Sequence, residues 1–175
     1  MSNVIYYDIA KCDNCGDCVA SCKATHLGRA HIFVQQVHES FLPSTCRQCE
    51  HSACVQVCPT GACHRSEDGT VVIASMKCVG CQLCSIACPF GSIWFDTLNK
   101  VSRKCDLCRE ARVDGESPAC VQACREKGAL RFGELEAMLA IARAQGSPTY
   151  MTRSGGTVGG LVSVPENWPQ GAHHG

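Results

Sequence analysis

The chain has 175 residues, no formal net charge and 17 cysteines, and only 6% of its residues are aromatic. This length allows one domain or two small ones, and the shortage of bulky apolar side chains predicts that burial alone does not stabilise the fold. Residues 1–8 lack the basic and apolar regions of a signal peptide, and no stretch approaches the roughly 18 apolar residues of a membrane helix, so we expect a cytoplasmic protein without a direct membrane span.

The regular elements expected along the chain are short. Segments rich in Val, Ile and aromatic residues predict strands in small antiparallel ribbons at residues 4–7, 31–38, 70–74, 92–95 and 129–132. Residues 134–144 carry Leu135, Met138, Leu139 and Ala142 at helical spacing and predict one amphipathic helix. The Gly-, Ser- and Pro-rich residues 146–175 predict an extended tail, for which disorder and docking along a partner surface are equal alternatives.

Sixteen of the cysteines fall into four quartets, each expected to form a loop followed by a helical turn. The quartets are Cys12, Cys15, Cys18, Cys22; Cys46, Cys49, Cys54, Cys58; Cys78, Cys81, Cys84, Cys88; and Cys105, Cys108, Cys120, Cys124. The third matches, at every spacing, the ferredoxin run Cys-x2-Cys-x2-Cys-x3-Cys-Pro, in which three cysteines hold one cluster and the fourth serves its neighbour. The second quartet has two extra loop residues, and the fourth has a long insertion. We therefore predict four 4Fe-4S clusters whose binding is coupled to folding.

Cluster binding would change the charge of the protein. Sixteen thiolates and four oxidised cores of about +2 each give a holoprotein charge of roughly −8. This charge excludes nucleic acid as an expected partner.

The pattern of one regular, one expanded, one regular and one long-insertion quartet resembles four-cluster electron-transfer subunits. These are the iron-sulfur subunits of the dimethyl sulfoxide reductase and formate dehydrogenase group, hydrogenase-linked ferredoxin-like proteins, the carbon monoxide dehydrogenase electron carrier and the polyferredoxin subunit of tungsten aldehyde oxidoreductases. The resemblance covers about residues 6–132 and includes Cys-Pro-Thr-Gly-Ala at 58–62, Cys-Pro-Phe-Gly at 88–91 and Lys-Cys-Asp-Leu-Cys at 104–108. It implies an α+β fold, a duplicated bacterial dicluster ferredoxin with small ribbons and short helices around four clusters.

The resemblance also implies how the quartets pair, with the first exchanging its last cysteine with the fourth and the second with the third. The implied ligand sets are Cys12, Cys15, Cys18 with Cys124; Cys105, Cys108, Cys120 with Cys22; Cys46, Cys49, Cys54 with Cys88; and Cys78, Cys81, Cys84 with Cys58. The corresponding parts are an outer module (1–45 and 97–132), an inner module (46–96), the helix (133–145) and the tail (146–175). Lys23 and Arg125 stand where such quartets often have proline, which is a departure in the outer pair.

The expected function is non-catalytic electron transfer. The chain would pass single electrons between the catalytic large subunit of a tungsten or molybdenum enzyme oxidising an aldehyde or formate and a second redox subunit of the flavin or NAD type, or a soluble ferredoxin. Carbon monoxide dehydrogenase or hydrogenase is the alternative catalytic partner. A further alternative is that copies of the protein associate with one another and so extend the path of the electrons. The alternative of another class is a zinc-binding structural module, because repeated Cys-x2-Cys pairs also suit tetrahedral zinc.

Several residues outside the quartets have two interpretations. Cys63 is expected as a small buried hydrophobe rather than a ligand or redox thiol, and no histidine ligand is expected because sixteen cysteines satisfy four clusters. Trp94 and Phe95 are expected to pack against the clusters. The basic residues near the quartets would either grade the cluster potentials or form a solvated surface; they are Lys11, Lys23, Arg47, Lys77, Arg103, Lys104, Arg109 and Arg125.

Overall fold

The computed structural model describes residues 3–110, 115–144, 149–150 and 160–163. The helices are η1 (Ile9–Lys11), α1 (Asp17–Thr25), α2 (Ala53–Gln56), η2 (Ser75–Lys77), α3 (Leu83–Ala87), α4 (Ala119–Ala123) and α5 (Leu135–Ala144). The strands are β1 (Asn3–Asp8), β2 (Phe33–Val37), β3 (Ser40–Ser44), β4 (Cys63–Arg65), β5 (Val71–Ile73), β6 (Ile93–Asp96), β7 (Val101–Lys104), β8 (Leu130–Glu134), β9 (Thr149–Tyr150) and β10 (Gly160–Ser163).

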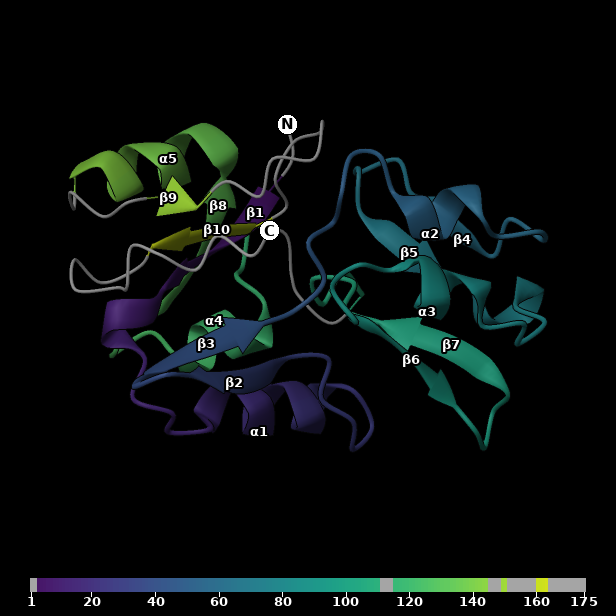
Figure 1. Cartoon of the computed structure of the whole chain (residues 1–175), viewed down its shortest axis with the longest axis horizontal. Coiled ribbons are helices and arrows are strands. Elements are labelled where there is room, and N and C mark those ends of the chain that lie inside the picture. The colour runs from purple at the N-terminus through teal and green to yellow at the C-terminus, as the bar shows by residue number, and fades with distance from the viewer. Residues whose placement is uncertain (1–2, 111–114, 145–148, 151–159, 164–175) are drawn as a thin grey trace.

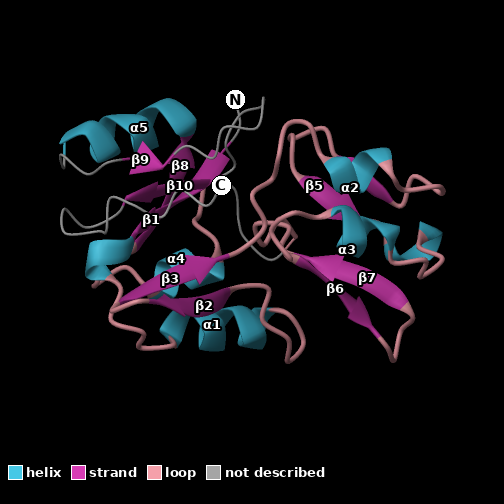
Figure 2. Ribbon diagram, viewed as in Figure 1, coloured by secondary structure: helices cyan, strands magenta, loops and turns pink. Residues whose placement is uncertain are grey.

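The small antiparallel ribbons and short helices of an α+β fold are confirmed (Figure 2). All five predicted strands are present as β1, β2, β5, β6 and β8, and the predicted amphipathic helix is α5. The sequence analysis missed the partner strands β3, β4 and β7, which complete three two-stranded ribbons with β2, β5 and β6. These strands are short or carry polar residues and proline, so their composition does not mark them.

A four-stranded sheet in the order β8-β1-β10-β9 forms the largest ordered layer. β1 pairs antiparallel with β8, with Ile5 opposite Phe132, and parallel with β10, with Tyr6 opposite Leu161. Residues 160–163, expected within an extended tail, therefore add a strand to the chain's own sheet, and this strand is parallel to β1 rather than antiparallel. The other expectations for the tail, at residues 145–148, 151–159 and 164–175, lie outside the described residues.

Both faces of β1 are covered, which explains why its residues from Val4 to Asp8 are all buried. Side chains alternate between the faces of a strand. Val4 and Tyr6 pack with Met138 and Ala142 of α5. Ile5 and Tyr7 point to the other face, where they join a cluster containing Cys18, Cys22, Cys105, Cys120 and Cys124. The sheet therefore connects an ordinary helix-on-sheet core with a cysteine-lined interior.

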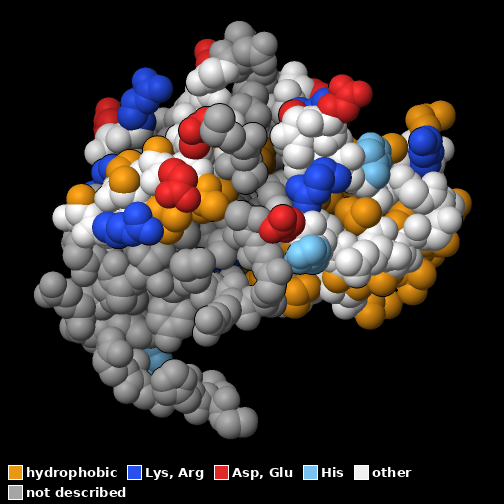
Figure 3. Space-filling view, turned by 90° about the horizontal axis from the view of Figure 1, so that it is seen from above, with side chains coloured by type: hydrophobic (Ala, Val, Ile, Leu, Met, Phe, Trp, Pro, Cys, Tyr) orange, Lys and Arg blue, Asp and Glu red, His pale blue; other side chains and the backbone are white. Residues whose placement is uncertain are grey.

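The two halves of the molecule are nested in the sequence (Figure 1). The elements from β1 to β3 and from α4 to β10 lie in one half, and the elements from α2 to β7 lie in the other. Exposed apolar side chains gather on the second half (Figure 3), where Met76, Val79 and Ile86 are 99%, 68% and 81% exposed. No helix in the described ranges is long and apolar enough to cross a membrane.

Candidate metal centres

The first three cysteines of each quartet are carried by loops that bend in the same way. The residue just before the second cysteine has a positive φ in every quartet: 61° at Asn14, 50° at Gln48, 70° at Gly80 and 60° at Leu107. Such a bend turns main-chain amides toward the cysteines, as shown by Leu107, whose N–H donates to Cys105 Sγ at 3.4 Å. At Gly80 a Cβ atom would lie 2.6 Å from the Lys100 carbonyl oxygen, so only glycine fits there.

Three of the four implied ligand sets each surround a hollow. Site A is defined by Cys12, Cys15, Cys18 and Cys124, which line one cavity. Site C is defined by Cys46, Cys49, Cys54 and Cys88, which line a second cavity. Site D is defined by Cys58, Cys78, Cys81 and Cys84, which line a third. In each site the structure brings the last cysteine of one quartet beside three cysteines of another.

Site B, defined by Cys22, Cys105, Cys108 and Cys120, is the most enclosed of the four. All four of its cysteines are buried. Cys22, Cys105 and Cys120 belong to one buried cluster. Burial raises the pKa of Cys120, and the charges of Cys105, Cys108 and Cys22 raise it further. The His31 N–H donates to Cys22 Sγ at 3.2 Å. Helices α1 and α4, which carry Cys22 and Cys120, pack against each other.

Electrostatic interactions link cysteines of successive sites. Charges act between Cys120 of site B and Cys18 of site A, and between Cys105 of site B and Cys46 of site C. Cys84 of site D interacts in the same way with Cys54 of site C. Together with the hydrogen bond from Gln48 in the site C loop to the Cys105 carbonyl oxygen of site B, these electrostatic interactions indicate the order A, B, C, D.

The donor set of each site fits a group that carries positive charge. Burial raises the pKa of Cys18 to about 11, with added effects from the charges of Cys124, Cys12 and Cys15, and burial raises the pKa of Cys105 to about 12. These two thiols are therefore protonated at neutral pH, whereas a hydrogen bond from Cys63 lowers the pKa of Cys54 in site C. Four thiolates at one site require a bound cationic core. Among the described residues, no three Cys, His, Asp or Glu side chains are arranged to hold a single metal ion, and the cysteines stand around hollows instead.

Buried polar residues join sites B and C. Gln48, between two cysteines of site C, donates from Nε2 to the Cys105 carbonyl oxygen at 2.9 Å and accepts from the Val71 N–H at 2.8 Å. The Lys104 ammonium, in a residue that is 5% exposed, donates to the same Cys105 carbonyl oxygen at 2.7 Å and also to that of Val71. Lys104 is therefore not part of a solvated surface.

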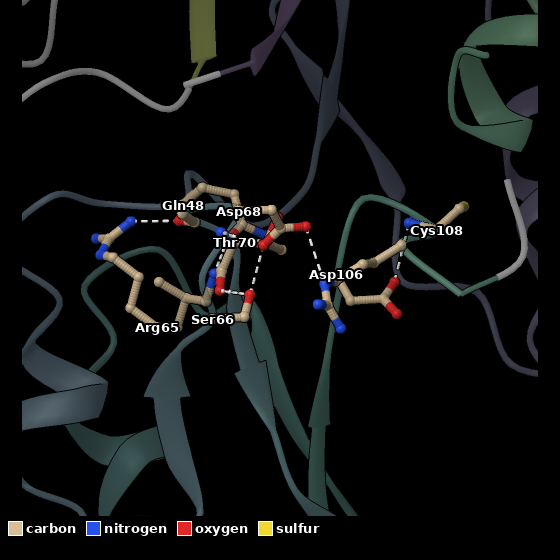
Figure 4. A network of polar contacts seen from close by, with 10 residues as sticks. Gln48, Arg65, Ser66, Asp68, Thr70, Asp106 and Cys108 are labelled. Atoms are coloured by element: carbon tan, nitrogen blue, oxygen red, sulfur yellow. Dashed lines mark hydrogen bonds and ion pairs between the residues drawn. The ribbon is translucent and has the colours of Figure 1, made fainter. Parts of the chain in front are cut away.

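A second polar network fixes the loop that carries Cys108 (Figure 4). Asp68 accepts hydrogen bonds from Ser66 and from the Thr70 N–H, and its other oxygen pairs with Arg109 Nε at 2.8 Å. Burial opposes the ionisation of Asp68, but these hydrogen bonds and Arg109 lower its pKa to about 2. Asp106 Oδ1 accepts from the Cys108 N–H at 3.0 Å, which closes the loop from within.

Two of the expectations outside the quartets can be compared with the structure. Cys63 is 2% exposed, as expected for a small buried side chain, and lies in the wall of site D, where its N–H donates to Cys58 Sγ at 3.3 Å. Arg47 lies 5.6 Å from the ring centroids of both Tyr7 and Phe90, so its guanidinium is packed on aromatic faces beside site C.

The sequence analysis missed a histidine that contacts a candidate ligand. His26 Nε2 lies 3.4 Å from Cys108 Sγ, and its ring stacks on His31 with centroids 4.5 Å apart. His26 and Cys108 are 82 positions apart in the sequence, so spacing could not reveal the contact. The ring centroid of Trp94 lies 5.8 Å from that of His31 and 4.9 Å from the Cζ atom of Arg29.

Comparison with known proteins agrees with this arrangement of cysteines. Residues 37–135 match the model of the 4Fe-4S dicluster domain. The protein belongs to this family. This protein is 34% identical over 147 residues to the thiosulfate reductase electron transfer subunit PhsB of Salmonella typhi, with 76% of each sequence covered. It is 31% identical over 150 residues to the B subunit of the anaerobic dimethyl sulfoxide reductase of Escherichia coli (strain K12), with 75% of this sequence and 73% of that one covered.

Two further similarities differ in strength. This protein is 37% identical over 140 residues to the uncharacterized ferredoxin-like protein YdhX of Escherichia coli (strain K12), covering 73% of this sequence and 63% of that one. A solved structure of the active site complex BamBC of benzoyl coenzyme A reductase aligns with 83% of this protein and 89% of its own matched polypeptide, at 21% identity and a TM-score of 0.37. The family resemblance inferred from the cysteine quartets is confirmed by the sequence relatives.

Proposed function

We propose that this protein is the non-catalytic electron-transfer subunit of an oxidoreductase and holds four 4Fe-4S clusters, one in each of sites A to D. The observation that supports the proposal is that cysteines of two different quartets line each of three hollows, and that the four remaining cysteines of the quartets are all buried. Each cluster, when bound, takes up and releases one electron. All four positions in each set are cysteines, so no position is left for a substrate.

The fold is a duplicated dicluster ferredoxin in this proposal. The outer module, proposed as 1–45 and 97–132, contributes the cysteines of sites A and B, and the inner module (46–96) contributes those of sites C and D. Within the outer bounds, β7 pairs with β6 and lies in the half of the inner module. The exchange of last cysteines would link α1 with α4 and α2 with α3. The packing of α1 against α4 supports the pairing of the first and fourth quartets, and the packing of α2 against α3 supports that of the second and third. At the junction between sites B and C, Gln48 donates to the Cys105 carbonyl oxygen and Lys104 to the Val71 carbonyl oxygen, and both hydrogen bonds join the two modules.

The surfaces near sites A and D are the proposed docking surfaces for the redox partners. Cys15 of site A and Cys81 of site D are exposed, whereas the cysteines of site B are buried. Near Cys15 the surface is charged and carries the Lys127–Asp13 ion pair. Around Cys81 it is apolar, with Val79 and Ile86 exposed. An apolar surface suits a stable subunit interface, and a charged one suits transient docking of a soluble carrier.

The partners are proposed from the relatives. PhsB and the dimethyl sulfoxide reductase subunit belong by name to reductases with more than one subunit, which supports a catalytic large subunit as the partner of this protein. Our first choice remains a tungsten or molybdenum enzyme acting on an aldehyde or formate, with carbon monoxide dehydrogenase or hydrogenase as the alternative. A flavin- or NAD-type subunit or a soluble ferredoxin in the cytoplasm would exchange electrons at the other end.

Two measurements test the proposal. Anaerobically purified protein should be brown, should bleach with dithionite and should develop the electron paramagnetic resonance signals of reduced 4Fe-4S clusters. A colourless protein containing zinc would overturn it in favour of the structural module. Mass spectrometry of the subunits that co-purify with the protein from its native host then identifies the catalytic partner, and recovery without any oxidoreductase subunit would contradict the assignment.

A further inference from the structure

The contact between His26 and Cys108 ties a side chain that is not a ligand to site B. His26 follows α1 directly, and its N–H donates to the Cys22 carbonyl oxygen at 3.0 Å, which fixes its main chain beside a cysteine of the same site. Its ring then reaches Cys108 Sγ at 3.4 Å. One histidine thus contacts site B through both its main chain and its side chain.

The ring of His26 is held in place from behind. It stacks on His31 with an interplanar angle of 23°, and Trp94 of β6 packs against the far side of this pair. Thr45 Oγ1 donates to the His31 carbonyl oxygen at 2.9 Å, which anchors the middle of the stack. Contacts from both halves of the molecule therefore restrict the movement of the imidazole, and a restrained donor loses little conformational entropy when it forms a hydrogen bond.

The direction of the hydrogen bond follows from the chemistry of the ligand. A cysteine that binds iron is a thiolate, which has no proton to donate and only accepts. The Nε2 atom of His26 must then carry the hydrogen and donate it to Cys108 Sγ. Hydrogen bonds to ionised acceptors are stronger than those between neutral groups, and hydrogen bonds to the sulfurs are among the factors that set cluster potentials.

From this contact we infer that His26 raises the reduction potential of the cluster in site B. This inference rests on the proposed function. Reduction adds negative charge to the site, and a donor at the ligand sulfur stabilises the reduced form more than the oxidised form. Site B has little access to water that could do the same, because all four of its cysteines are buried. His26 therefore acts on the cluster through the Cys108 sulfur, and it makes the cluster in site B easier to reduce.

His26 also lies at the surface of a cleft. The cleft has a volume of about 660 Å³ and is lined by residues of both halves, including His26, Trp94 and His64. His64 provides a matched comparison because it lines the same cleft but its Nδ1 contacts the Ala62 carbonyl oxygen, at 3.1 Å. Replacement of either histidine changes the same cleft, but only one replacement removes a contact with a candidate ligand.

The test is a redox titration followed by electron paramagnetic resonance on the full-length holoprotein and its variants. The site B signal is assigned by its change in Cys108→Ser. His26→Leu should shift the site B potential to more negative values and leave the other three potentials and the iron content unchanged. His26→Gln keeps an N–H donor at a similar reach and should restore most of the shift, whereas His64→Leu should leave all four potentials unchanged.

Three results would overturn the inference. Unchanged potentials in a fully loaded His26→Leu protein would show that the contact does not affect reduction. Loss of about four iron atoms per molecule in both His26 variants would show that the residue holds the cluster and does not tune it. An equal shift in His64→Leu would assign the effect to the cleft. Absence of 4Fe-4S clusters from the wild-type protein would instead contradict the proposed function, so the two failures are distinguishable.

Discussion

The Lys104 ammonium donates to the main-chain carbonyl of Cys105 at 2.7 Å, in the buried junction between sites B and C. Burial has the largest effect on the pKa of Cys105 and raises it, whereas the positive charge of Lys104 lowers it. A hydrogen bond from Cys63 has the largest effect on the pKa of Cys54 and lowers it, and the charge of Lys104 lowers it further. Its charge therefore acts on cysteines of both sites. A buried cation is costly unless negative charge lies near it, and thiolates of bound clusters supply that charge.

Replacing Lys104 should therefore change the two central potentials together. Lys104→Met removes a positive charge that favours the reduced form, so the potentials of sites B and C should become more negative while those of A and D stay close to the wild type. Redox titration measures all four. Lys100→Met, at an exposed turn, is the control. Equal shifts in both variants would show that overall charge, and not the buried position, sets the effect.

Gln48 provides a test of how the halves are joined. Gln48→Leu removes the hydrogen bonds to the Cys105 carbonyl and from the Val71 N–H and leaves a buried donor without its partner. The free energy of unfolding of the holoprotein should fall by about 1–3 kcal/mol. Denaturant unfolding followed by the loss of cluster absorbance measures it. Gln35→Leu, at an exposed position of β2, should change stability by less than about 0.5 kcal/mol, and equal losses would refute the role of Gln48.

Cys63 should behave as a wall residue and not as a ligand. Cys63→Ala should retain about sixteen iron atoms per molecule, whereas Cys54→Ser, in site C, should retain about twelve. Iron and protein assays on the same anaerobic samples give both values. The interpretation fails if the Cys63 variant loses as much iron as the Cys54 variant.

The exchange of last cysteines makes a prediction about double variants. Cys12→Ser should lower the iron content to about twelve atoms per molecule, and adding Cys124→Ser should cause no further loss because both residues belong to site A. Cys12→Ser with Cys22→Ser should lower it to about eight, because Cys22 belongs to site B. If the values of the two double variants were reversed, the pairing of the quartets would be wrong.

The apolar surface around site D should bind a partner subunit. Ile86→Glu combined with Met76→Glu places two charges on this exposed surface, where burial in an interface would be costly. The yield of the co-purifying catalytic or redox subunit should fall at least tenfold while the iron content stays at about sixteen. Leu27→Glu, an equally exposed apolar position on the other half, is the control. Full recovery of the partner with the double variant would place the interface elsewhere.

The sequence predicted the parts of this protein that depend on local spacing. The quartets marked the loops and helical turns, because each cysteine run must bend around its site within a few residues. β1 was predicted from its Val, Ile and aromatic residues, and α5 from apolar residues at helical spacing. The pairing of Cys22 with a distant quartet came from the family resemblance and not from spacing. Strands β4 and β7 are short and polar, and their partners stabilise them more than their own composition does.

Contacts between distant segments could not be predicted in the same way. Gln48 to Cys105 and His26 to Cys108 each join residues far apart in the sequence, and only the packing of the two halves brings them together. The strand Gly160–Ser163 lies in a segment whose Gly-rich flanks predicted a tail, and its place beside β1 depends on the sheet edge that β1 offers. Long-range pairing of this kind leaves no local pattern in the sequence.

The central claim is that four sets of cysteines each hold one 4Fe-4S cluster. The most direct measurement is an assay of iron and acid-labile sulfide per molecule after anaerobic reconstitution, combined with electron paramagnetic resonance of the reduced protein. The account predicts about sixteen atoms of each and magnetic interaction between neighbouring reduced clusters. A content of about eight or fewer, or signals of isolated clusters only, would contradict it.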